Sequence, residues 1–104
     1  MVDKQAVKSL PKLDLHLHLD GAIRTETIRD LAREHDVEMP SYEVQELAKH
    51  VQVQPSCRNL SEFLQCFETF YPVLQYPSAL ERIAYELCED LAAQGVIYAE
   101  TRFA

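Results

Sequence analysis

A strictly alternating stretch near the N-terminus constrains the fold of this chain more than any other feature. From Pro11 to Gly21 the residues read PKLDLHLHLDG, with leucine at every second position from Leu13 to Leu19. Period-two alternation of this kind is typical of a β-strand with two unlike faces. One face is apolar, and the other carries Asp14, His16, His18 and Asp20.

The spacing of His16 and His18 indicates a candidate metal site. On a strand, the Cα atoms of residues two apart are roughly 6.5–7 Å from each other, and their side chains point to the same side. Two imidazoles so placed can converge on one metal ion, which ring nitrogens bind at ~2.0–2.1 Å. The alternative is an ordinary half-exposed strand whose polar face meets water. Asp20 and Gly21 favour the metal site, because a carboxylate and a flexible turn at a strand end suit a ligand-binding loop.

Composition excludes several classes of partner. The 104 residues include 10 Lys and Arg against 17 Asp and Glu, a net charge of −7. Nucleic acids and anionic membranes attract basic patches, so neither is expected to bind. There is no apolar run of the ~18 residues that a membrane span needs, and the polar start does not resemble a signal peptide. Three cysteines without a C-x-x-C spacing indicate reduced thiols and a cytoplasmic protein.

Helical periodicity fills most of the chain between residues 25 and 92. The patterns predict helices over 25–37 and 42–50, with Thr25 as the N-cap of the first. A third helix follows Asn59 and Glu62, which have capping-box spacing, and carries an aromatic stripe from Phe63 to Tyr71. A fourth follows a second capping box at Ser78 and Glu81, and Gly95 is expected at its C′ position.

Residues 96–104 predict a second strand, because they are rich in β-formers and again alternate. Strand, helices, strand is a βαβ-type unit, which makes a parallel pair. Two parallel strands do not form a stable sheet alone, and a TIM-type barrel closes only with about eight strands and ~250 residues. The expected fold is therefore α/β, with residues 1–104 forming the N-terminal part of a single (β/α)8 barrel that is incomplete in this chain.

Several segments carry a family likeness. The stretch PKLDLHLHLDGAI from Pro11 to Ile23 closely resembles the opening strand of adenosine deaminases, which are metal-dependent barrels of the amidohydrolase type. The H-x-H pair alone is weak evidence, but H-L-D-G together with later matches is strong. These later matches follow in the same order as in the family, at Arg24–Ile28, at the F-L-x-x-F motif Phe63–Phe67, at Arg82–Glu86 and at Tyr98–Phe103.

The resemblance implies a (β/α)8 barrel with one zinc ion that hydrolyses adenosine or 2′-deoxyadenosine to inosine or deoxyinosine and ammonia. It implies that His16 and His18 are two of the zinc ligands and that Asp20 hydrogen-bonds a sugar hydroxyl of the purine nucleoside. It also implies an apolar wall of the pocket formed by Leu60, Phe63, Leu64 and Phe67. Without the family, the aromatic stripe is simply core; with it, Phe63 and Phe67 are expected near the pocket, and Phe70 and Tyr71 in the core.

The family's remaining ligands and its catalytic residues have no counterpart here. They lie in later strands, so the catalytic residues are expected after Ala104, and this chain alone is expected to be inactive. The remainder of the barrel, in the same or a separate chain, would be its partner. Adenine and AMP-type deaminases of the same fold are alternatives, although adenine deaminases tend to read H-L-E-G where this chain has Asp20. A further alternative is a non-catalytic barrel fragment that pairs with a partner chain.

Overall fold

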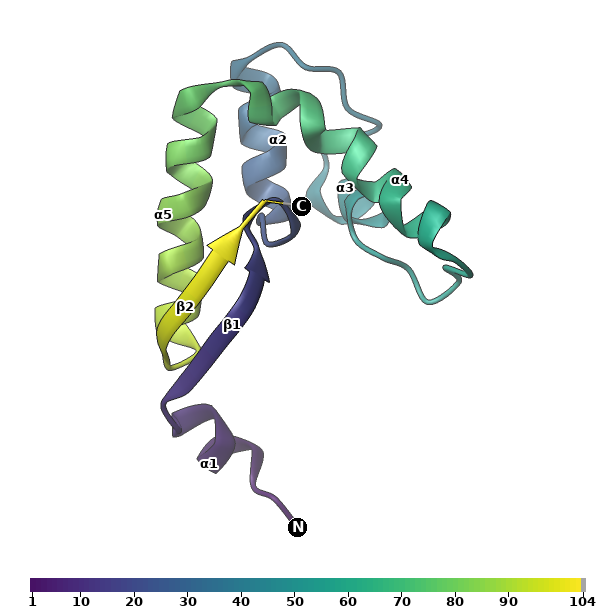
Figure 1. Ribbon diagram of the computed structural model, residues 1–104. Helices are drawn as coiled ribbons and strands as arrows, with labels where there is room; N and C mark the ends of the chain where they lie inside the picture. Colours follow the sequence, from purple (N-terminus) through teal and green to yellow (C-terminus); the bar gives the residue numbers. More distant parts are fainter. Residues whose placement is uncertain (104) are drawn as a thin grey trace. The chain divides into compact units, whose positions relative to one another are not determined.

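The computed structural model describes residues 1–103, which divide into two units (Figure 1). The first, here called the strand unit, contains Met1 to Ile23 together with the chain from Arg82 onward. The second, the helical unit, contains Arg24 to Glu81. The two candidate metal ligands therefore belong to the strand unit, and the candidate apolar wall belongs to the helical unit.

The strand unit is built on a parallel pair of strands, as predicted. It contains α1 (Lys4–Ser9), β1 (Lys12–His18), the 3₁₀ turn η1 (Leu19–Gly21) and β2 (Val96–Arg102), and α5 (Pro77–Ala93) enters it from the helical unit. The pairing of β1 with β2 is irregular at two points, between Lys12 and Leu13 and between Asp14 and Leu17. Of the predicted second strand, Ala104 lies outside the described residues.

Much of the apolar surface of the strand pair is exposed. Leu13 and Leu15 of β1 and Ile97 of β2 are each more than half exposed. Beside β2, α5 borders an apolar groove of about 350 Å³, whose walls include Leu87 and Ile97. Parallel sheets in proteins are normally covered on both faces, so this pair lacks the cover that its composition requires.

The helical unit has a conventional apolar core. It consists of α2 (Thr25–Glu34), α3 (Val44–Val51), α4 (Leu60–Phe70), the 3₁₀ segment η2 (Tyr71–Gln75) and the start of α5. Helix α3 contacts both α2 and α4, and η2 contacts α2 and α4. The buried apolar residues of this unit are Ile28, Leu31, Ala32, Met39, Leu47, Phe70, Val73 and Ala79.

Two of the predicted helix starts are wrong, the first by one position and the second by two. Arg24, not Thr25, is the N-cap of α2, and the hydroxyl of Thr25 accepts a hydrogen bond of 3.1 Å from Gln52. Helix α5 begins at Pro77, so Ser78 already lies inside it. Proline suits the first helical position because its φ is preset and its missing N–H has no partner there anyway. This preference outweighs the capping box read from Ser78 and Glu81.

Two other helix ends are as predicted. Asn59 caps α4, since its side-chain oxygen accepts the main-chain N–H of Glu62 at 2.9 Å. In a capping box the Glu62 carboxylate would accept the main-chain N–H of Asn59. Here it accepts the main-chain N–H of Arg58 instead. Gly95 follows α5 with φ of +76°, the left-handed conformation that glycine adopts without strain. Among residues 1–103, no helix is both long and apolar enough to cross a membrane.

Candidate functional site

His16 and His18 lie side by side at the end of β1. Their Nε2 atoms are 3.1 Å apart, and their ring centroids are separated by 5.1 Å. Alternation along the strand places the leucines on the other side, so the imidazoles share one polar face. The two rings therefore present their nitrogens to one common point.

The separation of the two nitrogens fits a shared metal ion. Nitrogens bound to one zinc at ~2.0–2.1 Å with a near-tetrahedral angle lie ~3.3–3.4 Å from each other. The 3.1 Å between Nε2 of His16 and Nε2 of His18 needs only a small adjustment to reach that value. Without a metal, the two rings can share one hydrogen bond at this distance, with one Nε2 donating and the other accepting.

The remaining donors of a metal site are not found within the described residues. A structural or catalytic zinc takes at least three protein ligands. In residues 1–103, no group of three His, Cys, Asp or Glu side chains is arranged to hold a metal ion. The Nδ1 atom of His18 is buried and has no hydrogen-bond partner in this part of the chain. Ligating histidines usually donate their second N–H, so His18 fits a ligand whose outer partner comes from other residues.

The carboxylates that flank the histidines have different surroundings. Asp14 accepts the main-chain N–H of His16 at 3.2 Å, which ties its side chain to the strand. Asp20 lies in η1, two residues after His18, and is only 4% exposed. Because a carboxylate is costly to bury, its position is held by interactions with other groups. Asp20 is therefore a fixed acceptor beside the imidazole pair.

The predicted apolar wall forms one row on α4. Leu60, Phe63, Leu64 and Phe67 recur at the i, i+3, i+4 and i+7 spacing that places side chains on one helical face. Leu60 is 69% exposed and Phe63 is 37% exposed, so the start of this row faces solvent. Phe63 and Phe67 pack edge to face, with centroids 5.5 Å apart. Leu60, Phe63 and Leu64 therefore offer an apolar surface that the helical unit leaves exposed, whereas Phe67 also contacts the core residue Phe70.

Phe70 and Tyr71 were both predicted to lie in the core, and the prediction is correct for Phe70 alone. Phe70 is 4% exposed and packs against the ring of Phe67 at 5.5 Å. Tyr71 is 39% exposed, so its core assignment is wrong. Helix α4 ends at Phe70 and the chain continues as the 3₁₀ segment η2. Pro72 follows Tyr71 directly and has no main-chain N–H to donate, so the α-helix does not continue and Tyr71 lies at its exposed end.

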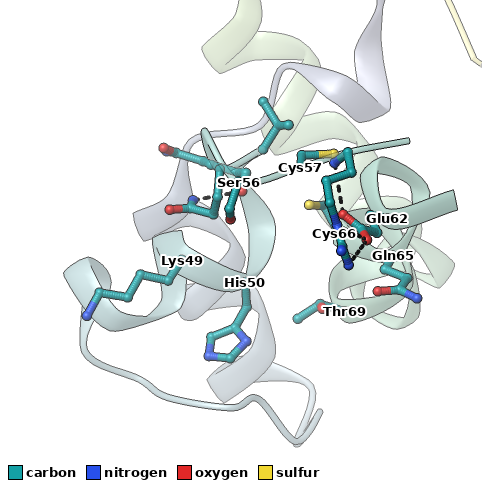
Figure 2. Close-up of a pocket in the computed structure, with 12 residues that line it drawn as sticks. Lys49, His50, Ser56, Cys57, Glu62, Gln65, Cys66 and Thr69 are labelled. Carbon is teal, nitrogen blue, oxygen red and sulfur yellow. Dashed lines mark hydrogen bonds and ion pairs between the residues drawn. The ribbon is translucent and has the colours of Figure 1, made fainter. Parts of the chain in front are cut away.

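The helical unit also contains a polar cavity that the sequence did not suggest. It has a volume of about 790 Å³ and lies between α3, α4 and the loop that joins them (Figure 2). Its walls include His50, Cys57, Arg58 and Cys66, whereas none of the site residues predicted from sequence lines it. Arg58 is paired with Glu62 at 2.9 Å, so the two charges largely cancel there. None of the residues in its walls is fully buried.

One exposed ion pair sits at the edge of this cavity. Lys49 donates to Glu46 at 2.8 Å on the surface of α3. The hydrogen bond and the positive charge of Lys49 lower the pKa of the Glu46 carboxylate, and the same contact raises the pKa of Lys49. Both groups are in water, where such pairs contribute little to stability.

Lys12, in the strand unit, has contacts that the sequence pattern did not indicate. Its ammonium donates hydrogen bonds to the carbonyl oxygens of Lys8, Leu10 and Gln94. At the other end of the pair, Arg102 donates to the carbonyl of Leu15 at 3.2 Å. No local pattern could have revealed the contact of Lys12 with Gln94, because the two residues are 82 positions apart.

Comparison with protein families and curated sequences gives a consistent result. The family model described as adenosine deaminase matches residues 11–104. A probable adenosine deaminase of Dictyostelium discoideum is 47% identical over 97 residues, which are 93% of this chain and 13% of that protein. An adenosine deaminase of Clostridium botulinum (strain Loch Maree / Type A3) is 45% identical over 97 residues, 93% of this chain and 29% of that protein.

Solved structures show the same fold. An adenine deaminase from Arthrobacter aurescens matches with a TM-score of 0.75 and 30% identity, covering 88% of this chain and 27% of that chain. The Arabidopsis protein ADAL in complex with IMP matches with a TM-score of 0.73 and 31% identity, covering 96% of this chain and 28% of that chain. The chain thus spans less than a third of the length of these relatives and has the fold of the N-terminal part of their (β/α)8 barrel.

Proposed function

Because this chain belongs to the adenosine deaminase family, we propose that it contributes two metal ligands and part of the substrate pocket to a zinc-dependent adenosine deaminase. The reaction is the hydrolysis of adenosine or 2′-deoxyadenosine to inosine or deoxyinosine and ammonia. The observation that carries the proposal is the convergence of the His16 and His18 nitrogens, 3.1 Å apart on one face of β1. Zinc with an open coordination position supplies a water whose pKa is lowered to near ~7, the nucleophile that this hydrolysis needs.

Each residue of the proposed site has a separate task. His16 and His18 hold the ion through Nε2, and the leucines on the other face of β1 anchor the strand once the remainder of the barrel covers them. Asp20 accepts a hydrogen bond from a sugar hydroxyl of the nucleoside, a role that its fixed and buried position suits. Leu60, Phe63, Leu64 and Phe67 contribute an apolar wall, which excludes water from the purine. The proton-transfer groups of the reaction are not among these residues and belong to the remainder of the barrel.

The remainder of the barrel is the proposed partner of this chain, in the same polypeptide or in another. The exposed leucines of β1 and the apolar groove between α5 and β2 support this proposal, since a parallel pair is normally covered on both faces. The three cysteines of the chain are free thiols, which supports a reducing, cytoplasmic location. The acidic composition supports a small-molecule substrate and neither nucleic acid nor a membrane as partner.

The test is a deamination assay, with and without zinc, on this chain together with the remainder of the barrel, here called the intact protein. Adenosine, 2′-deoxyadenosine, adenine and AMP are compared, and loss of the adenosine absorbance band is followed together with release of ammonia. The account expects the two nucleosides to be the best substrates and activity to disappear with a chelator. If only adenine or AMP is turned over, the substrate is a nucleobase or a nucleotide instead, as the adenine deaminase and the IMP-bound ADAL structure would suggest. No turnover of any of them would favour a non-catalytic module.

The role of Asp20 can be tested separately with Asp20→Asn, which keeps the side-chain volume. A hydrogen bond to a charged group contributes ~1.5–3 kcal/mol, so KM for adenosine is expected to rise roughly 10- to 150-fold. Adenine has no sugar, and its binding provides the matched control because it is expected to change little. An unchanged KM for both nucleosides, in a variant that unfolds at the same temperature as the wild type, would contradict the assignment of Asp20 to the substrate pocket.

A further inference from the structure

The ammonium of Lys12 is held by three main-chain carbonyl groups. Its Nζ atom lies 2.9 Å from the oxygen of Lys8, 2.9 Å from that of Leu10 and 2.8 Å from that of Gln94. An ammonium has three N–H donors and no acceptor, so all its hydrogen-bonding capacity is used here. We call these contacts the Lys12 clasp.

The clasp joins three segments of the strand unit. Lys8 belongs to the last turn of α1, Leu10 follows that helix, and Gln94 directly follows α5. Carbonyl groups at helix C-termini lack intrahelical partners and carry partial negative charge, which makes them good acceptors for a cation. The main-chain N–H of Lys12 also donates to the carbonyl of Gly95 at 2.9 Å. Lys12 therefore fixes the start of β1 against the chain that leads into β2.

Gly95 allows the segments to approach each other this closely. A Cβ atom at this position would lie 3.1 Å from the carbonyl oxygen of Leu10 and 3.4 Å from Nζ of Lys12. The first distance is shorter than an ordinary contact, so the carbonyl of Leu10 would have to shift, and the φ of +76° disfavours a side chain as well. The turn before β2 and the clasp are thus parts of one arrangement.

The alternation of β1 leaves its register open. A one-residue slip against β2 would exchange the faces of the strand, which the hydrophobic pattern forbids. A two-residue slip keeps leucine on one face and polar residues on the other, because the stretch LDLHLHLD repeats every two residues. The pairing with β2 is also interrupted at two points, so the hydrogen bonds between the strands do not by themselves fix one register. The register of β1 must therefore be fixed by a contact at a position that does not repeat along the strand.

We propose that Lys12 is a positioning residue, which selects the register of β1 and thereby places His16 and His18 at the metal site. A two-residue slip would carry its ammonium roughly 6.5–7 Å along the strand and break its contact with Gln94. At the opposite end, Arg102 makes one bond of 3.2 Å to the carbonyl of Leu15, which supports the same register with fewer contacts. The link to the metal rests on the proposed function, whereas the link to the register does not.

The experiment compares Lys12→Met with Lys4→Met in the intact protein. Lys4 also belongs to the N-terminal segment and makes no side-chain hydrogen bond among residues 1–103, so its replacement removes the same charge without removing a clasp. Cobalt(II) alone is titrated in, and its visible spectrum and affinity are recorded. Lys12→Met is expected to weaken cobalt binding ~10- to 100-fold and to alter the spectrum, as loss of a group that orients a ligand does. Lys4→Met is expected to match the wild type.

Amide hydrogen exchange across β1 and β2 is measured on the same proteins. Lys12→Met is expected to exchange at least ~10-fold faster in these strands, since a charge-assisted hydrogen bond is lost. In Lys12→Ala, ammonium chloride is expected to restore protection, whereas tetramethylammonium chloride, which has the same charge and no N–H, is not. This variant also replaces Lys12→Met if the latter fails to fold.

The outcomes separate the two proposals. Unchanged cobalt affinity, spectrum and exchange in Lys12→Met would overturn the positioning role. A wild-type protein that binds no metal would overturn the proposed function, and the exchange data would then decide on the clasp alone. Faster exchange with unaltered cobalt binding would limit Lys12 to stability and contradict its role in placing the histidines.

Discussion

Replacing His18 with alanine is expected to weaken zinc binding by more than ~100-fold and to abolish deamination in the intact protein. Loss of a partner that merely orients a metal ligand already costs about 10- to 100-fold, and loss of the ligand itself costs more. The Nε2 atom of His18 lies 3.1 Å from that of His16, so either variant leaves a single imidazole at the shared point. His16→Ala is expected to have the same effect. Zinc affinity is measured by competition with a chromophoric chelator.

The matched control for this prediction is His50→Ala. His50 is exposed on α3 in the helical unit and lines the polar cavity (Figure 2). Like His18→Ala, this variant removes one imidazole from the chain. Its zinc affinity and activity are expected to stay within about twofold of the wild type. Equal losses in His50→Ala and His18→Ala would mean that β1 has no special part in metal binding.

Replacing Phe70 with alanine is expected to destabilise the protein by about 3–5 kcal/mol. Phe70 is 4% exposed and contacts the rings of Phe67 and Tyr71, so its removal leaves a cavity in the helical core. Phe63→Ala, on the same helix, is expected to cost less than about 1.5 kcal/mol because Phe63 is 37% exposed. Urea denaturation of the two variants measures the difference.

Substrate binding is expected to respond to the two phenylalanines in the opposite order. Phe63 belongs to the proposed pocket wall, so Phe63→Ala is expected to raise KM for adenosine about tenfold or more, which corresponds to the loss of ~1.5 kcal/mol of apolar burial. Phe70→Ala, measured where it remains folded, is expected to leave KM nearly unchanged. A larger effect of Phe70→Ala on KM than of Phe63→Ala would contradict the assignment of the exposed row to the pocket.

The parts of the structure that the sequence predicts depend on local periodicity. Alternation over β1 correctly predicts a strand, and the parallel pairing follows from two strands separated by helices. The shared face of His16 and His18 is a direct consequence of the two-residue repeat. Gly95 at the end of α5 was predictable because few residues other than glycine adopt its φ of +76°.

Other parts of the structure depend on which of two competing helix-start signals is used, or on contacts between residues far apart in the sequence. Pro77 and Ser78 both offer a helix start, and only the folded chain shows that Pro77 is used. Tyr71 is exposed because α4 ends beside it, and Pro72 indicates that end in the sequence but not that the last ring of the stripe is left uncovered. The bond from Lys12 to Gln94 joins residues at opposite ends of the chain, so periodicity could not reveal it. The metal role of the histidines stays a prediction drawn from their geometry and their family.

The central claim is that His16 and His18 bind one divalent ion together. Zinc-edge X-ray absorption on the intact protein, followed by the same measurement on His16→Ala and His18→Ala, tests it most directly. The account predicts nitrogen scatterers at ~2.0–2.1 Å with imidazole outer shells in the wild type, and a loss of bound zinc in either variant. Sulfur ligands at ~2.3 Å, or bound zinc whose spectrum is the same in both variants as in the wild type, would contradict it.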